Sequence, residues 1–241
     1  MKIVTVNDYD EMSKFAAKII ASQIILKENS VLGLATGGTP LGMYKELINL
    51  YNKENLNFSK VQTFNLDEYY GVSDDNPQSY HYYMKNNFFK FTNIKNENIN
   101  ILDGTTSDIE NECKSYDNKI LSSGGIDIQV LGIGENGHIG FNEPDINFEA
   151  KTHLVKLDEK TIEANSRFFN SKNEVPTSAL SMGIKTIMQS KKILLLANGE
   201  KKAEAIFKMV NGKISPEVPA SILQLHNDTT IIIDKAAAKM L

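Results

Sequence analysis

The sequence predicts an α/β protein with a single domain: a mainly parallel open sheet with helices on both faces, Rossmann-like in its order of elements. Apolar runs of strand length alternate with helical patterns along the whole chain. Such alternation is typical of parallel sheets, whose crossover helices cover both faces. The 241 residues contain no internal repeat, low-complexity tract or linker, so one domain (1–241) is the simplest interpretation.

The elements follow one another in a regular order. Strands are predicted at the short apolar runs Ile3–Val6, Val31–Leu34, Val61–Leu66, Ile126–Ile133, Ile193–Ala197 and Thr229–Ile233. Helices are predicted where apolar residues recur on one face: from about Asp8 to Ile24, from Leu41 to Tyr51, and over Asp108–Leu121, Ile184–Met188 and Lys201–Val210. Thr39 is expected to cap the second helix, with Pro40 at its first position.

Residues 142–176 break this rhythm. The segment begins with Asn142 and Pro144, includes a short apolar run at His153–Leu157 and continues through a polar stretch. It is either an ordinary irregular surface excursion or a lid. Long excursions in compact domains are often lids or binding loops, so we expect a lid within residues 142–176.

Composition limits the function classes. The formal net charge is −4 and no dense basic run is present, which argues against nucleic acid or an anionic membrane as a partner. The one cysteine, Cys113, cannot form an internal disulfide, the N-terminus has no signal-like run, and no stretch is long enough for a membrane helix. We expect a cytoplasmic protein, and the sequence leaves a homo-oligomer open.

Ligands of open parallel sheets bind beyond the carboxyl ends of the strands, and three predicted strand ends carry notable residues. The first is followed by Thr36, Gly37, Gly38 and Thr39 and then by a helix N-terminus, which presents free backbone N–H groups. A plain strand–helix turn is the alternative, but the glycines together with the threonine hydroxyls favour phosphate binding. No Gly-Lys-Ser/Thr follows, so this is not a Walker A loop.

The second strand end carries Asp67 and Glu68. A carboxylate at this place can act as a general base. An aspartate after a strand more often caps a turn, and these two residues taken alone favour that simpler role.

The third strand end has glycines in the spacing of a dinucleotide-binding fingerprint: Gly132, Gly134 and Gly137. A fingerprint must open a helix, whereas this segment runs on to Pro144 through residues that a regular helix excludes, so no dinucleotide cofactor is expected. The loop instead concentrates Asn136, His138 and Glu143, which together can relay protons.

Two further observations concern metals and phosphate. The other histidines, His81, His153 and His226, lack the spacing of metal ligands, so no metal site is expected. Arg167 is the only arginine among 26 basic residues. It is either a chance survivor in a lysine-rich chain or a position that needs a planar, bidentate donor.

Four segments, in this order along the chain, resemble the glucosamine-6-phosphate deaminase family: Leu32–Pro40, Phe64–Tyr69, Gly134–Pro144 and Asn165–Phe169. The resemblance extends over essentially the whole chain, and four motifs in family order are far more specific than any one of them. It implies hydrolytic deamination with isomerisation, in which glucosamine-6-phosphate and water give fructose-6-phosphate and ammonia without a cofactor or metal. The expected partner is therefore a small sugar phosphate.

The resemblance also implies a role for each residue. Asp67 matches the base that moves a proton between C2 and C1, and His138 matches the ring-opening acid/base, oriented by Asn136 and Glu143. The phosphate is expected at the loop that holds Thr36, Gly37, Gly38 and Thr39. Two cations match its further contacts, Lys202 and, from the lid, Arg167.

The chain departs from the family in two ways. Some members have aspartate where this chain has Asn136. An asparagine can orient His138 but cannot stabilise its cationic form, so a different pH profile is expected unless Glu143 compensates. The chain ends at Leu241, shorter than members whose C-terminal extension builds an allosteric hexamer. Activation by N-acetylglucosamine-6-phosphate is therefore not expected.

Two rival functions remain. A 6-phosphogluconolactonase has a related fold, a phosphate loop and a Gly-His segment, but it hydrolyses an ester; the stretches Asn142–Pro144 and Asp67–Tyr69 favour the deaminase. A sugar-phosphate sensor needs no proton relay and usually carries a DNA-binding segment, and this chain has no basic helix-turn-helix.

Overall fold

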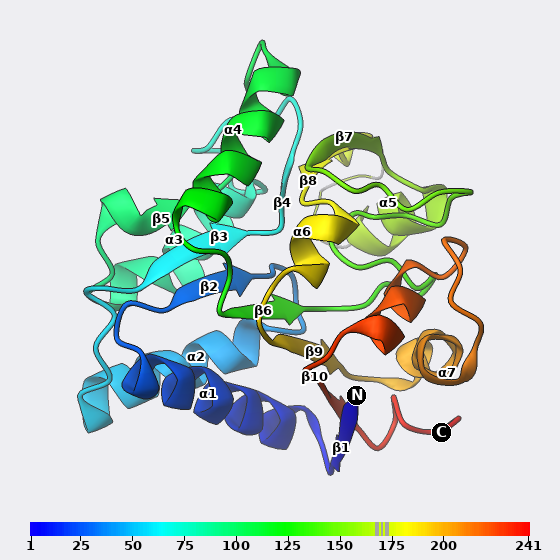
Figure 1. Ribbon diagram of the computed structural model, residues 1–241, viewed down its shortest axis with the longest axis horizontal. Coiled ribbons are helices and arrows are strands. Elements are labelled where there is room, and N and C mark those ends of the chain that lie inside the picture. Colours follow the sequence, from blue (N-terminus) through cyan, green and yellow to red (C-terminus); the bar gives the residue numbers. More distant parts are fainter. Residues whose placement is uncertain (167–168, 170, 172–173) are drawn as a thin grey trace.

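The computed structural model describes residues 1–166, 169, 171 and 174–241, and a seven-stranded sheet forms its centre (Figure 1). Every neighbouring pair in this sheet is parallel. The strand order is β1 (Lys2–Val6), β10 (Thr229–Asp234), β9 (Ile193–Ala197), β6 (Ile128–Leu131), β2 (Val31–Leu34), β3 (Gln62–Asn65) and β5 (Ile99–Asn100). The predicted parallel α/β class is confirmed.

Helices cover both faces of this sheet. Figure 1 shows α1 (Tyr9–Leu26) and α2 (Leu41–Glu54) below the sheet and α4 (Ile109–Ser122) and α6 (Ile184–Met188) above it. Their apolar faces and the strands enclose one large core, in which β6 and β9 are buried at every position. The other helical segments are α3 (Tyr80–Asn87), α5 (Glu159–Asn165), α7 (Ala203–Asn211) and the 3-10 turns Phe89–Phe91, Asn96–Asn98, Glu200–Lys202 and Pro219–Leu225.

A second, smaller sheet stands above the carboxyl ends of the large one. It is antiparallel, in the order β4 (Asp67–Tyr69), β8 (Ser178–Ser181) and β7 (His153–Lys156). Leu66 joins the two sheets, because its N–H donates to Leu34 O at 3.0 Å and its carbonyl accepts from Met182 N at 2.7 Å. A separate apolar cluster, Tyr69, Phe141, Leu157 and Ala179, packs beneath the small sheet.

Three details differ from the sequence predictions. The strand predicted at Val61–Leu66 is one residue shorter at each end, since β3 spans Gln62–Asn65, and Asp67 then begins an unpredicted strand of the other sheet. Thr39 is not the cap of α2: Pro40 holds that position, and the Thr39 hydroxyl donates to Asn198 Oδ1 at 3.2 Å instead. The excursion at 142–176 is more regular than expected, since it contains β7 and α5.

The strand order reverses between β2 and β6. From β2 the chain moves outward to β3 and β5, and it returns on the other side of β2 with β6, β9 and β10. Ligands of open α/β sheets bind at such a reversal, beyond the carboxyl ends of the strands. The loops that follow β2 and β6 are the two glycine-rich segments, 35–40 and 132–143.

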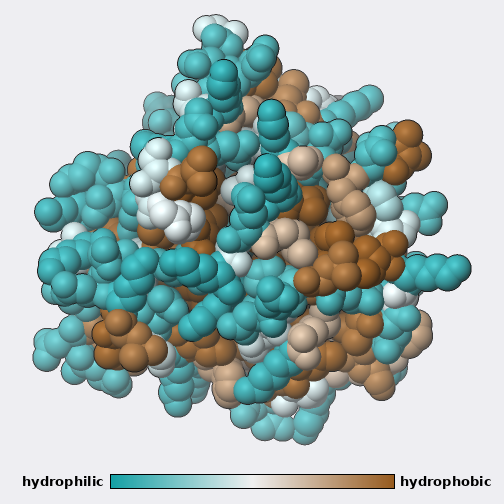
Figure 2. Space-filling model, viewed as in Figure 1, coloured by the Kyte–Doolittle hydropathy of each residue, from teal (hydrophilic) through white to brown (hydrophobic). Residues whose placement is uncertain are grey.

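The visible surface is mainly hydrophilic (Figure 2), in line with the ordinary share of charged residues in the sequence. Figure 2 shows hydrophilic residues over most of one face, with hydrophobic residues grouped toward the side where Figure 1 draws α5 and α7. None of the described helices combines the length and apolar character needed to span a membrane.

Candidate active site

The loop at 35–40 is held by tyrosine hydroxyls from neighbouring helices. Tyr83 donates to the Gly37 carbonyl at 2.6 Å, and Tyr9 donates to the Gly38 carbonyl at 2.8 Å. Gly37 has φ +90°, a left-handed conformation that favours glycine. No described residue accepts a hydrogen bond from the N–H groups of these two glycines. Those N–H groups, next to the N-terminus of α2, are therefore available to an anion.

The end of β9 lies beside this loop. Asn198 accepts the hydrogen bond from Thr39, and Gly199 turns the chain with φ +87°. The Gly199 N–H donates to both oxygens of Asp234 at 3.0 Å, which fixes the turn to β10. Lys202 ends the 3-10 turn Glu200–Lys202 beyond the carboxyl end of β9, with its N–H donating to Gly199 O at 3.1 Å.

Asp67 lies at the start of β4 and is only 7% exposed. Burial, and secondarily the neighbouring charge of Glu68, raises the pKa of the Asp67 carboxyl to about 8. A carboxyl with a pKa near neutral accepts and releases a proton at working pH, which a general base must do. The predicted strand before Asp67 ends at Asn65, and Asp67 itself belongs to β4 of the smaller sheet.

The loop at 132–143 brings together the other three predicted acid–base residues. His138 Nδ1 lies 3.1 Å from Glu143 Oε2, and the Asn136 amide donates to the same oxygen at 2.8 Å. The Asn136 carbonyl oxygen accepts from the backbone N–H of His138 at 3.2 Å, so Asn136 contacts the loop and Glu143, not the imidazole. Thr161, from α5, lies 3.4 Å from His138 Nδ1.

Glu143 is the anion of this cluster. Burial alone would raise its pKa, but the hydrogen bond and charge of His138, with hydrogen bonds from Thr161 and Asn136, outweigh burial and lower it. A carboxylate opposite Nδ1 fixes the imidazole with its proton on that nitrogen. Nε2 is then the nitrogen left for a substrate.

Glycines let the loop fold this tightly. A methyl group added at Gly134 would lie 2.4 Å from Cε1 and Nδ1 of His138, so the ring packs directly on the Gly134 backbone. One added at Gly140 would lie 3.8 Å from Asp67 Oδ2, which places the loop against the base. The Ser181 hydroxyl, on the strand paired with β4, accepts from Phe141 N at 2.9 Å and locks this contact.

The structure therefore brings nine of the ten predicted site residues to one edge of the sheet: Thr36, Gly37, Gly38, Thr39, Asp67, Asn136, His138, Glu143 and Lys202. The tenth, Arg167, lies outside the described residues. Tyrosines connect the parts, since Tyr80 hydrogen-bonds Thr36 and stacks with Phe141 at 6.2 Å between ring centroids. The hydrogen bonds from these tyrosine hydroxyls could not be predicted from the sequence, because a bond between residues far apart in the chain leaves no local pattern.

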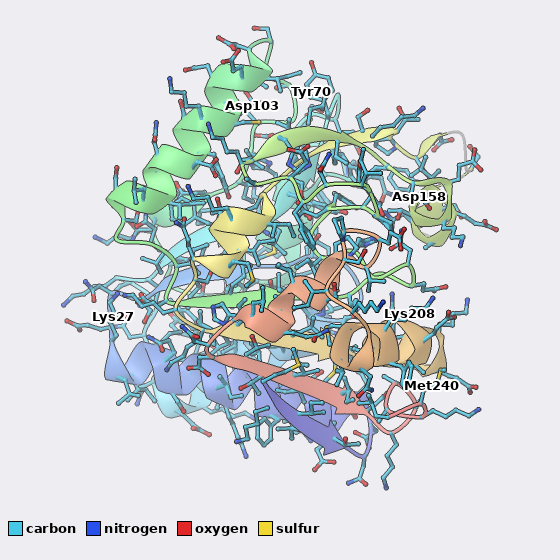
Figure 3. The ribbon with its side chains drawn as sticks, turned by 45° about the vertical axis from the view of Figure 1, so that its right-hand side comes forward. Lys27, Tyr70, Asp103, Asp158, Lys208 and Met240 are labelled. Carbon is cyan, nitrogen blue, oxygen red and sulfur yellow. The ribbon has the colours of Figure 1, made fainter. Side chains whose placement is uncertain are left out.

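A cavity of about 280 Å³ opens beside the acid–base loop, between α5 and α7. Its lining includes Asn136, Lys160, Glu204 and Lys208. Figure 3 labels Lys208 on α7 and Asp158 at the start of α5, on the same side of the molecule. Among the described residues, no group of three or more His, Cys, Asp or Glu side chains is placed to hold a metal ion.

Comparison with known proteins agrees with this geometry. The family described as glucosamine-6-phosphate isomerases/6-phosphogluconolactonase matches residues 7–232. The chain belongs to this family. Glucosamine-6-phosphate deaminases of Clostridium botulinum and Clostridium novyi are each 65% identical to it over 241 residues, covering 100% of this chain and 99% and 100% of those proteins.

Solved structures extend the comparison. A monomeric glucosamine-6-phosphate deaminase has a TM-score of 0.98 and 50% identity, with 100% of both chains covered. The 6-phosphogluconolactonase of Thermotoga maritima has a TM-score of 0.76 and 20% identity, covering 97% of this chain and 99% of that one. At that identity the second likeness shows the shared fold alone.

Proposed function

We propose that this protein converts glucosamine-6-phosphate and water into fructose-6-phosphate and ammonia. The observation that carries the proposal is the meeting of two proton-transfer groups at one point. The buried Asp67 carboxyl lies against the loop in which Glu143 orients His138. The close relatives that bear the name of this activity support the same assignment.

The proposed chemistry divides between these groups. The His138 imidazole is oriented by Glu143, which Asn136 holds in turn; its Nε2 takes the proton of the C1 hydroxyl and passes it to the ring oxygen as the C1–O5 bond breaks, which opens the sugar to its aldehyde. Asp67 takes the proton from C2 and returns it to C1 while the C1 aldehyde oxygen gains a proton from solvent, which turns the C2 amine into an iminium group. Water adds to C2 and ammonia leaves. Each positioned proton transfer contributes about 10²–10⁴-fold to the rate.

The phosphate supplies binding energy remote from the reacting carbons. The free N–H groups of Gly37 and Gly38 and the hydroxyls of Thr36 and Thr39 form its proposed cradle, and the cations Lys202 and Arg167 complete it. Binding there fixes C1 and C2 against Asp67, so that remote energy is used for orientation.

Residues 142–176 are the proposed lid. Its helix α5 touches both parts of the site, because Thr161 reaches His138 and the Asn165 amide donates to the Tyr69 hydroxyl at 3.0 Å. A segment so attached excludes water from the sugar when it closes. The buried free thiol of Cys113 suits a proposed cytoplasmic location.

The first test is an assay of purified protein, treated with EDTA, for ammonia and fructose-6-phosphate. Equal release of both products is expected. Hydrolysis of 6-phosphogluconolactone without ammonia release would instead assign the lactonase chemistry that other members of the family carry out.

A variant then tests the base. Asp67→Asn should lower kcat about 10²–10⁴-fold with little change in KM, because the lost group acts chiefly in the transition state. Asp10→Asn, an exposed substitution of the same type on α1, should leave both constants unchanged. Full activity of Asp67→Asn would remove Asp67 from the mechanism.

A further inference from the structure

Glu68, the neighbour of Asp67, is a completely buried carboxylate with an unusual number of donors. Its Oε1 accepts from the backbone N–H groups of Tyr69 at 2.8 Å and Tyr80 at 2.9 Å. Its Oε2 accepts from the backbone N–H of His81 and lies 2.9 Å from the Nδ1 atom of the same residue. Four donors therefore converge on the two oxygens of Glu68.

Helix capping alone does not account for Glu68. The helix α3 already has its cap in Ser79, whose hydroxyl accepts from Tyr82 N at 3.0 Å. A neutral side chain elsewhere would serve the remaining N–H groups at a lower desolvation cost. Glu68 directly follows Asp67 on β4, and its charge contributes, after burial, to the raised pKa of Asp67.

His81 connects Glu68 to solvent. Its Nδ1 also lies 3.3 Å from Asp74 Oδ1, so two carboxylates face that nitrogen and the proton belongs there. The side chain is 26% exposed and lines a cavity of about 980 Å³ between α3, β5 and α4. Burial alone would lower the pKa of His81, but the hydrogen bond to Glu68 and the charges of Asp74, Glu68 and Asp103 outweigh it and raise the pKa.

Other charged groups share the cavity with His81. Besides Asp74 they are Asp75, Lys85, Lys90, Glu112 and Lys119. Among the described residues, the ionisable groups influenced by the Asp67 charge are the hydroxyls of Tyr44, Tyr69, Tyr80 and Tyr116. Burial raises the pKa of each of these hydroxyls, so they stay neutral while Asp67 titrates.

We propose that Glu68 and His81 form a positioning pair that sets the proton affinity of Asp67. The Glu68 charge makes ionisation of Asp67 harder, and a proton on His81 offsets that charge. The solvent-facing imidazole thereby tunes the base without touching the substrate. The inference rests on the proposed role of Asp67 as the base.

The test is the pH profile of kcat/KM for glucosamine-6-phosphate. His81→Gln keeps a donor for Glu68 but cannot be protonated, so the acidic limb should move to higher pH by about 0.5 unit or more. Glu68→Gln removes the charge, and the limb should move to lower pH. His153→Gln removes an imidazole from the same small sheet that bonds to the Lys151 carbonyl, and its limb should coincide with that of the parent chain.

A carbon-13 titration of the Asp67 carboxyl gives a second readout that needs no activity. Its midpoint should rise in His81→Gln. If both the limb and the midpoint stay within about 0.2 pH unit of the parent, the pair serves α3 only and the inference is overturned. Absence of any deaminase activity in the parent chain would overturn the proposed function, while the carboxyl titration would still decide the coupling.

Discussion

Replacing Gly134 by alanine tests whether catalysis depends on where the His138 ring lies. The added Cβ would stand 2.4 Å from Cε1 and Nδ1 of the imidazole, whereas ordinary carbon contacts begin near about 3.5 Å. The ring must therefore move by roughly 1 Å, which changes its position relative to the Glu143 oxygen that now lies 3.1 Å from Nδ1. A misplacement of that size costs about 10²-fold in rate, so kcat should fall by that order.

The same loop supplies a matched control. A Cβ at Gly132 would meet no atom within 4 Å, so Gly132→Ala should keep kcat within about threefold of the parent. Both variants should show the same circular dichroism, and fructose-6-phosphate release should be followed over a range of substrate concentrations. Equal kcat values for Gly134→Ala and Gly132→Ala would refute the idea that the packed ring position matters.

Three further outcomes follow from the site. Tyr83→Phe frees the carbonyl of Gly37 and should raise KM a few-fold, for a loss of about 1 kcal/mol, while Tyr82→Phe on the exposed side of α3 should not. The folded-state pKa of Asp67 is raised, so its contribution to stability is complete below its unfolded pKa and is lost as pH rises through about 8. The melting temperature of Asp67→Asn should accordingly exceed that of the parent at pH 9, and the gap should close toward pH 4; an equal gap at both values would contradict the burial argument. Arg167→Lys should raise KM because a point charge replaces a bidentate donor. Unchanged kinetics would mean that an arginine at position 167 has no specific role in binding.

Several elements could be predicted from the sequence because their signals are local. Val31–Leu34 and Ile193–Ala197 are continuous apolar runs, and both strands have the predicted bounds. Asp8 was expected near the start of the first helix, and it caps α1 by accepting from Glu11 N at 2.8 Å. Residues that precede a helix or fill a buried strand act mainly through their own neighbours.

Other features depend on contacts between distant segments. The strand β4 has only three residues, two of them acidic, and its pairing comes from Ser178–Ser181 more than 100 residues later. Three of the four donors that hold Glu68 come from α3, and the hydroxyl of Thr39 bonds to Asn198 instead of capping its helix. The sequence analysis recognised Asp67 through the family resemblance, whereas its burial became evident only in the folded chain.

The two sheets carry different parts of the proposed site. The large sheet carries the anion cradle and the imidazole loop, whereas the proposed base and lid belong to the small sheet of β4, β8 and β7. Leu66 connects the two sheets along the chain, and its backbone forms hydrogen bonds with Leu34 on one side and Met182 on the other. Substitutions in the small sheet would therefore change the proposed proton transfer at C2 and C1, while the proposed phosphate contacts on the large sheet stay in place.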